Sequence, residues 1–245
     1  MVVKTHRSHP QPQISPPAVK STAREYFESI CVAVILALFI RTFVVQAFKI
    51  PTGSMEPNLL IGDHLLVNKM VFAPIETGLE DRLLPIRDIH RTDVIVFKYP
   101  LDPERDFIKR VIGLPGDSVR IENKQVYING EPLDEPYAYF SQPPGNPEAG
   151  VFFDLRRDNM PELVVPPGNY FVMGDNRDNS HDSRFWGTLP GELVKGRALM
   201  VYWSYEAPKE AYLATGFSER IKQIISVVIH FFGRTRWKRF FHLVR

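Results

Sequence analysis

Cysteine is almost absent from this chain. With Cys31 alone, neither an internal disulfide nor a cysteine-based zinc cluster can form. The sequence also lacks HExxH, GxxxxGKS/T, GxGxxG and GxSxG, so it gives no support to a zinc protease, a nucleotide-binding protein or an α/β-hydrolase. The seven histidines are scattered, and none stands at metal-ligand spacing with another on a shared element. We therefore predict neither a metal nor an organic cofactor.

Acidic residues are missing from residues 1–24, which carry four Lys or Arg. Residues 219–245 carry seven Lys or Arg against Glu219. Because the net charge of the whole chain is only +2, the body between these segments is acidic. A nucleic-acid-binding domain would carry its positive charge as a patch on the folded body, so we predict no nucleic-acid partner. Basic segments beside apolar ones suit an anionic membrane surface instead.

The longest apolar run follows the first basic stretch. Residues 30–40 carry no charge, and the run from Tyr26 to Phe48 can cross a hydrocarbon core of roughly 30 Å if Glu28 and Arg41 lie near the two interfaces. We predict a disordered cytoplasmic lead-in over 1–20 and a transmembrane anchor helix over 21–48. Because the basic residues precede the helix, the N-terminus is expected in the cytoplasm and the rest outside it.

Two other interpretations of this run stay open. One is a cleaved signal peptide, because residues 45–47 place small side chains at cleavage spacing. The leader before Ile30 is long and polar, however, and Arg41 breaks the run before that point. The other is a buried core helix, which an uncharged run of this length also permits. The anchor is favoured over both.

Strand-like segments dominate from Lys49 onward. Short runs rich in Val, Ile, Phe and Tyr alternate with Gly, Pro, Asn and Asp, and no convincing helix occurs between 50 and 205, so we predict a mainly β body. The expected strands are 64–71, 93–99, 107–112, 118–121, 124–128, 169–173 and 195–204. We predict a catalytic domain over 49–205 with a proline-rich inserted subdomain at 122–165. Residues 206–245 indicate an amphipathic, basic and aromatic tail, either at a membrane surface or packed on the body.

Ser54 lies in the segment IPTGSMEP, which begins at Ile50. Two prolines fix φ and Gly53 permits backbone conformations closed to other residues, so the loop is expected to be rigid and tightly turned. Such a loop can hold a nucleophile and aim backbone N–H groups at an oxyanion. On composition alone a plain connecting turn is favoured, because Pro, Gly and Ser dominate ordinary turns.

Two adjacent basic residues interrupt the apolar segment DFIKRVIGLPGD. If 107–112 is a strand, Lys109 shares a face with Phe107, and Arg110 lies on the opposite face. Whichever residue faces inward must be desolvated. Arginine keeps its charge there, whereas a buried lysine can lose its proton and act as a general base near pH 7. In isolation, an exposed edge strand with snorkelling basic tips is favoured.

The third candidate segment, GDNRDNSHDSRFWG, follows the expected strand 169–173. Asp182 and Arg184 lie two residues apart and can pair with each other or with neighbouring strands. A loop this polar is either solvated or a hydrogen-bonded scaffold that holds a catalytic group. A calcium loop is conceivable from its Asp and Asn content, but the Gly at the sixth position and the Glu at the twelfth are missing.

Taken together and in this order, these segments closely resemble type I signal peptidase, the membrane-bound leader peptidase of bacteria. The resemblance is carried by PTGSMEPNLLIGDHLLVNK, DVIVFKYP, DFIKRVIGLPGD, GDNRDNSHDSRFWG and GRALMVYWS, and it covers most of the chain from about 25 to 205. It implies the family's fold, which is mainly β, with a catalytic body and an inserted smaller subdomain behind one N-terminal transmembrane helix.

The resemblance also implies catalytic roles. Ser54 is expected to be the nucleophile and Lys109 the general base of a Ser/Lys dyad that uses no histidine. The expected oxyanion donors are the N–H of Ser54 and the side chain of Thr52, where the family often has serine. Ser180 is expected to orient the lysine amine.

Further matching residues surround this expected dyad. Asp182 and Arg184 resemble the family's structural ion pair near the site. His181 stands where small residues are common and is given no role. The residues that resemble walls of the shallow substrate pockets are Ile50, Pro51, Met55, Phe107 and Ile108.

The implied function is that of a serine endopeptidase that removes N-terminal signal peptides from exported preproteins through an acyl-enzyme. Its expected partners are these preproteins and membrane lipid, in the bacterial inner membrane as a single-pass protein, with a monomer favoured. Two alternatives remain. A tethered binding protein without activity is disfavoured because Ser54, Lys109 and Ser180 are all present. A self-cleaving repressor with a similar dyad is disfavoured by the anchor and by the lack of a DNA-reading helix before residue 50.

Overall fold

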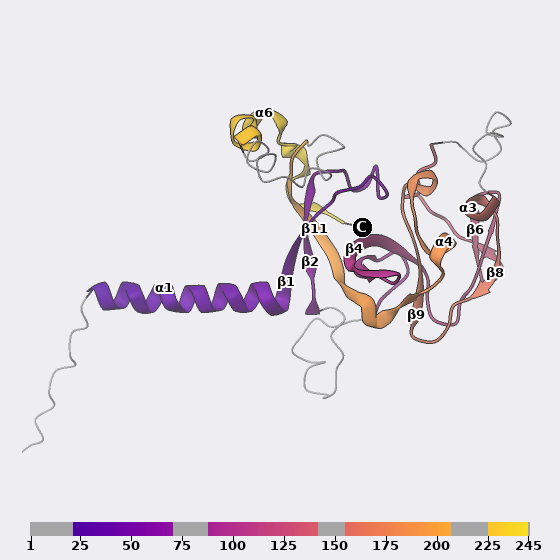
Figure 1. The fold of residues 1–245 in the computed structure, drawn as a ribbon, viewed down its shortest axis with the longest axis horizontal. Coiled ribbons are helices and arrows are strands. Elements are labelled where there is room, and N and C mark those ends of the chain that lie inside the picture. The colour runs from indigo at the N-terminus through magenta and orange to yellow at the C-terminus, as the bar shows by residue number, and fades with distance from the viewer. Residues whose placement is uncertain (1–21, 71–87, 142–154, 207–224, 245) are drawn as a thin grey trace, which may run out of the picture. The chain divides into compact units, whose positions relative to one another are not determined.

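The computed structural model describes residues 22–70, 88–141, 155–206 and 225–244 (Figure 1). The expected lead-in 1–20 lies outside the described residues, as do the middle of the expected insertion and the first part of the expected tail. The chain divides into two compact units, residues 1–40 and 41–245, and each is described by itself.

Helix α1 spans Thr22–Phe39 and contains no buried residue. A single π-helical turn, Ile40–Val44, follows it, and Val45–Lys49 then form strand β1. The prediction of one helix over 21–48 is therefore wrong for its last residues. In the described part of the chain, no helix is both long enough and apolar enough to cross a membrane.

Strand β1 forms because a partner strand is available. It pairs antiparallel with β2, Asp63–Asn68, in the register Val45↔Asn68 to Lys49↔His64. Valine and phenylalanine favour strands when such a partner exists, and Phe48 packs against the main apolar core. Residues 45–47, which suggested a cleavage site, are thus part of the sheet.

The main sheet has the strand order β1-β2-β11-β3-β4-β9-β10, and β12 pairs with β11 outside this path. All of its pairings are antiparallel. The prediction of a mainly β body is confirmed. The remaining strands of this sheet are β3 Val94–Tyr99, β4 Asp102–Gly113, β9 Asn169–Met173, β10 Leu189–Pro190, β11 Val194–Ser204 and β12 His242–Leu243.

A second sheet has the order β7-β6-β5-β8 and lies beyond β9 in Figure 1. Its strands are β5 Ser118–Glu122, β6 Gln125–Ile128, β7 Glu131–Pro132 and β8 Met160–Val164. The turn between β5 and β6 places Asn123 and Lys124 at φ values of 48° and 71°, as a tight hairpin requires. The sheet begins slightly before the expected insertion boundary at 122, because β5 pairs with both β6 and β8.

Short helices complete the described body. Among the described residues before β11, the single-turn α-helices are α3, Leu155–Asp158, and α4, Ser183–Trp186. In the same part of the chain, η4, Arg177–Asn179, and η5, Gly191–Leu193, are 3-10 turns. These turns are too short to give a periodic apolar pattern, which is why the sequence predicts none of them.

Apolar clusters cover both faces of strand β4. Ile108 belongs to a cluster that also contains Met55 and Leu65, whereas Val111 belongs to a separate cluster with Phe97. A third cluster, which includes Ile112, fills the space beside the second sheet. Strand β4 is therefore a central strand whose last six residues are all buried.

The end of the chain is part of the body. After a helical stretch at 225–229, the chain forms α6, Phe231–Arg234, the 3-10 turn η7, Trp237–Arg239, and strand β12. Val244 is buried in the same apolar cluster as Met55. Within the described residues, the expected tail is therefore packed on the body by its last residues.

Candidate active site

The loop after β1 carries Ser54 and is closed at its base. Ile50 N donates a hydrogen bond of 2.8 Å to the carbonyl oxygen of Asp63, which brings the two ends of the loop together. Met55 and Leu59 are fully buried beneath it, and Leu59 N donates to the Met55 carbonyl at 2.9 Å. This apolar filling holds the loop in one conformation and leaves the Ser54 side chain 7% exposed.

Lys109 reaches the same place from strand β4. Its Nζ lies 2.7 Å from Ser54 Oγ and donates a second hydrogen bond, of 3.0 Å, to the carbonyl oxygen of Ile108. The lysine is 4% exposed, and the centre of the Phe107 ring lies 5.4 Å from its Nζ. No carboxylate among the described residues forms an ion pair with it. The fold thus joins two side chains that are 55 positions apart in sequence.

Burial controls the charge of this amine. Desolvation lowers the pKa of Lys109 from 10.5 to about 8. The charges of Asp182 and Asp175 act in the opposite direction, and the charge of Arg184 lowers the pKa further. Close to neutral pH, a useful fraction of the Lys109 amine is therefore uncharged and able to accept a proton.

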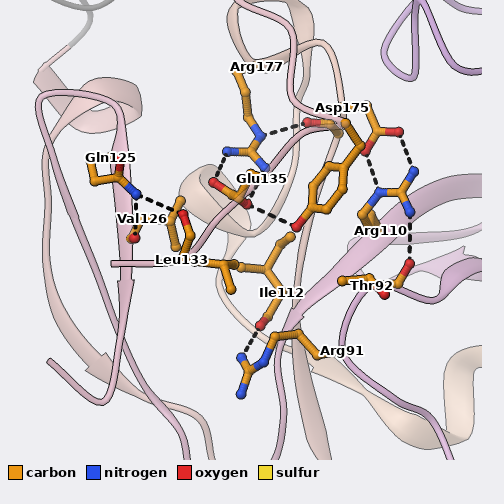
Figure 2. A network of polar contacts seen from close by, with 12 residues as sticks. Arg91, Thr92, Arg110, Ile112, Gln125, Val126, Leu133, Glu135, Asp175 and Arg177 are labelled. Atoms are coloured by element: carbon orange, nitrogen blue, oxygen red, sulfur yellow. Dashed lines mark hydrogen bonds and ion pairs between the residues drawn. The ribbon is translucent and has the colours of Figure 1, made fainter. Parts of the chain in front are cut away.

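Arg110, the next residue of β4, is also buried, but it forms an ion pair with Asp175. Its Nε and Nη2 each donate to the Asp175 carboxylate at 2.7 Å, and its Nη1 donates to the Thr92 carbonyl at 2.8 Å (Figure 2). Its guanidinium lies 4.2 Å from the centre of the Tyr137 ring. Both basic residues, rather than one, are thus desolvated, because both faces of β4 are covered.

The segment after β9 holds the Ser54 loop from the other side. Asn176 N donates to the Ser54 carbonyl at 3.1 Å, and Asn176 Nδ2 donates to the Gly53 carbonyl at 3.2 Å. A Cβ added at Gly174 would lie 2.5 Å from the Ser54 carbonyl oxygen and would also overlap Ser180. Only glycine lets these two backbones approach so closely.

Asp182 and Arg184 form a buried ion pair with each other, which is one of the two arrangements that their spacing left open and the one that the resemblance implied. Arg184 Nε and Nη2 each donate to the Asp182 carboxylate at 2.8 Å, and Gly174 N donates to it at 3.0 Å. Burial alone would raise the pKa of Asp182, but Arg184 and the Gly174 N–H hold it below its ordinary value. The carboxylates of Asp175 and Asp178 also form ion pairs with basic side chains, as Asp182 does.

Ser180 and Thr52 are the two residues whose expected roles depend on their hydroxyl groups. Ser180 is buried against Gly174, but no hydrogen bond joins its Oγ to Lys109 Nζ in the described part of the chain. Thr52 is exposed. Within the same described residues, neither the N–H of Ser54 nor the hydroxyl of Thr52 donates to another protein group. The roles expected for these groups stay predictions.

The residues expected to line substrate pockets divide into two groups. Ile50, Met55 and Ile108 are buried and share one apolar cluster beneath the Ser54 loop. Pro51 is exposed, and Phe107 is partly buried. Contact with substrate therefore stays a prediction for all five residues. In the structure, Ile50, Met55 and Ile108 support the Ser54 loop.

Several residues of the site are not found by sequence reasoning. Asn58 Nδ2 donates to Asp175 Oδ2 and to the Tyr137 carbonyl, both at 2.8 Å. Arg177 forms an ion pair with Glu135, which also accepts a hydrogen bond from Tyr137. These contacts connect the Ser54 loop with the region around the second sheet. The polar density of GDNRDNS is the one sequence signal that could have suggested such partners.

A buried lysine that is hydrogen-bonded to a serine hydroxyl, and that has no carboxylate partner in the described part of the chain, is typical of a serine hydrolase that works without histidine. The comparisons identify the family. A family model described as "Signal peptidase, peptidase S26" matches residues 23–203. The chain therefore belongs to the signal peptidase family of peptidases, S26, as the sequence motifs predicted.

Curated relatives agree with this assignment. A Signal peptidase I from Pseudomonas aeruginosa is 36% identical over 216 residues, which cover 77% of this chain and 75% of the relative. A Signal peptidase I from Aquifex aeolicus is 33% identical over 254 residues, covering 84% and 94%. A crystal structure of a signal peptidase I from Enterococcus faecalis V583 matches with a TM-score of 0.35 and 32% identity, covering 46% of this chain and 97% of that one.

Proposed function

We propose that this peptidase removes N-terminal signal peptides from exported preproteins, with Ser54 as the nucleophile and Lys109 as the general base. The names of its relatives support the substrate class. The observation that carries the chemistry is the 2.7 Å separation between Ser54 Oγ and a buried lysine amine that has no carboxylate partner within residues 22–70, 88–141, 155–206 and 225–244. A charged, ion-paired lysine could not accept the hydroxyl proton.

The proposed reaction has two stages. Neutral Lys109 takes the proton of Ser54 as Oγ attacks the carbonyl carbon after a small substrate residue, and the N–H of Ser54 with the hydroxyl of Thr52 stabilises the oxyanion. Lys109 then gives this proton to the leaving amine as the peptide bond breaks. Water, deprotonated by Lys109, hydrolyses the acyl-enzyme and releases Ser54. The substrate lies extended along the body by strand addition.

Attachment to the bacterial plasma membrane is the second part of the proposal. No residue of α1 is buried, and its large apolar side chains, among them Ile30, Ile35 and Leu38, are more than half exposed. An apolar helix in this state favours lipid over water. Basic residues precede it, so the proposed orientation leaves the N-terminus in the cytoplasm and the catalytic body outside.

The deciding experiment is a preprotein cleavage assay in detergent. Ser54→Ala is expected to reduce cleavage of a substrate with an Ala-x-Ala site to the uncatalysed background, because no nucleophilic oxygen remains at the amine. Ser118→Ala is the matched control, since Ser118 lies in the second sheet and should leave the rate unchanged. Circular dichroism checks that each variant folds. Cleavage by folded Ser54→Ala at the wild-type rate would refute the assignment.

The rate of cleavage is expected to rise with pH. Because the pKa of Lys109 is lowered to about 8, the base is mostly protonated below that pH and mostly neutral above it. We expect kcat/KM for a peptide substrate to reach half its plateau near pH 8, measured from about pH 6 to about pH 10. A flat profile over this range would exclude a titrating amine as the base.

A further inference from the structure

Asn176 contacts the backbone on both sides of Ser54. Its N–H donates a hydrogen bond of 3.1 Å to the Ser54 carbonyl, and its side-chain Nδ2 donates one of 3.2 Å to the Gly53 carbonyl. The Gly53 carbonyl also accepts a hydrogen bond of 3.2 Å from Glu56 N. A single residue after β9 thus holds the peptide units before and after the proposed nucleophile.

The peptide unit between Gly53 and Ser54 determines where the N–H of Ser54 points. This unit is trans, and in a trans peptide unit the carbonyl and the N–H point in opposite directions. The Gly53 oxygen faces Asn176 Nδ2, so the N–H of Ser54 points away from Asn176. Among the described residues, this N–H donates to no protein group. It is therefore available to an oxyanion.

The loop alone does not fix this orientation. Gly53 has no Cβ, so the backbone on one side of the peptide unit can adopt conformations that other residues cannot. Rotation of the unit would exchange the positions of its carbonyl and its N–H. A carbonyl oxygen would then point where the N–H now points, and it would repel a negatively charged oxygen. The hydrogen bond from Asn176 Nδ2 opposes this rotation.

Asn176 can resist the rotation because its own backbone is held from outside the loop. It is 7% exposed and forms a parallel bridge with Tyr139. Tyr139 N donates to the Asp175 carbonyl at 2.7 Å, and the Tyr139 carbonyl accepts from Arg177 N at 2.9 Å. Glu56, by contrast, belongs to the same loop as Gly53. Asn176 therefore provides the fixed point.

The side chain of Asn176 makes one hydrogen bond in the described part of the chain. Its Oδ1 is buried and has no partner there. The opposite orientation of the amide would place this oxygen against the Gly53 carbonyl oxygen, so Nδ2 is the atom that faces Gly53. Replacement by an apolar side chain therefore removes the hydrogen bond to Gly53 and no other hydrogen bond among these residues.

We propose that Asn176 is a positioning residue that aims the N–H of Ser54 at the oxyanion of the tetrahedral intermediate. This inference rests on the proposed function, because it requires attack by Ser54 and an oxyanion that accepts from its N–H. A donor that is aimed before the substrate arrives needs no reorganisation while negative charge develops on the substrate oxygen. Asn176 acts through the peptide unit and does not take part in the chemistry itself.

The first test separates kcat from KM in the full-length protein in detergent. Asn176→Ala is expected to lower kcat for a soluble peptide at least about tenfold and to leave KM within about twofold, because the oxyanion forms only after binding. Asn176→Leu, which keeps much of the shape without the donor, should lose as much. Asn179→Ala is the matched control, since Asn179 is exposed in the same segment. A wild-type kcat in either folded Asn176 variant would overturn the proposal.

The second test uses a peptide aldehyde that ends in alanine and the corresponding peptide alcohol. Ser54 Oγ adds to the aldehyde carbon, its proton passes to Lys109, and the carbonyl oxygen becomes the oxyanion. The alcohol has no carbonyl carbon to attack. Asn176→Ala should weaken inhibition by the aldehyde at least about tenfold and leave inhibition by the alcohol unchanged. Equal weakening of both inhibitors would show a general disturbance of the site and contradict the proposal.

The pH profile shows whether Asn176 acts through the N–H of Ser54 or through the lysine. We expect the rate of Asn176→Ala to reach half its plateau near pH 8, as in wild type, because the Lys109 amine is unchanged. A shifted midpoint would mean that Asn176 acts on the base, against the proposal. Failure of wild type to cleave any substrate would instead count against the proposed function.

Discussion

Replacement of Lys109 with methionine is expected to stabilise the fold at pH 7 while it ends catalysis. The site holds an amine whose pKa is lowered from 10.5 to about 8, which means that the folded protein disfavours the charged form. That difference corresponds to up to about 3 kcal/mol of unfolding free energy that methionine, of similar length and without charge, would restore. If Lys109 is the general base as proposed, its loss should reduce kcat/KM by at least about a hundredfold.

The dependence of this stabilisation on pH has a definite sign. Below pH 8 the lysine is protonated in both states, and the folded state carries the full penalty. Between about pH 8 and 10.5 the unfolded chain binds more protons than the folded one, so wild-type stability rises with pH. The advantage of Lys109→Met should therefore be largest at neutral pH and should shrink above pH 8.

Urea unfolding of both proteins at pH 7 and near pH 10 measures this difference. Ser54→Ala serves as the control, because it removes activity and leaves the buried amine in place. A Lys109→Met protein that is less stable than wild type at pH 7 would show that burial of the charged amine does not destabilise the folded protein.

Most long strands could be predicted from the sequence, because their signal is local. The runs at 93–99, 169–173 and 195–204 coincide with β3, β9 and β11 to within a residue or two. Strand β1 could not be predicted, since its valines and phenylalanine continue an apolar run that also suits a helix. Pairing with β2 makes residues 45–49 a strand instead of a helix, and no local sequence pattern predicts that contact.

The contact between Ser54 and Lys109 at the centre of the candidate site agrees with the sequence prediction, whereas the residues that support this contact were not predicted. The Pro and Gly residues around Ser54 and the apolar neighbours of Lys109 are local features of the sequence. The resemblance predicted that these two segments act together. The contacts of Asn58 and Asp175 depend on segments 117 positions apart. The contact between Arg239 and Asp63, which are 176 positions apart, likewise could not be predicted from the sequence. Charged side chains in such places look like ordinary surface residues until the fold buries them.

Replacement of Arg110 with methionine is expected to have the opposite effect from the same change at Lys109. Asp175 is fully buried and receives two hydrogen bonds of 2.7 Å from this guanidinium (Figure 2). Without Arg110 its charge would be left in the interior with Asn58 as the remaining side-chain donor among the described residues. Removal of one partner of a buried ion pair destabilises a protein by about 3–5 kcal/mol.

The substitutions Lys109→Met and Arg110→Met, at neighbouring positions of β4, thus test opposite expectations for stability. Urea unfolding at pH 7 should show Arg110→Met below wild type and Lys109→Met above it, although both changes remove one cation from the same strand. Asp175→Asn added to Arg110→Met should recover part of the loss, because the unpaired charge is then gone. An Arg110→Met protein as stable as wild type would mean that Asp175 finds water or another donor, and that this ion pair does not support the Ser54 loop.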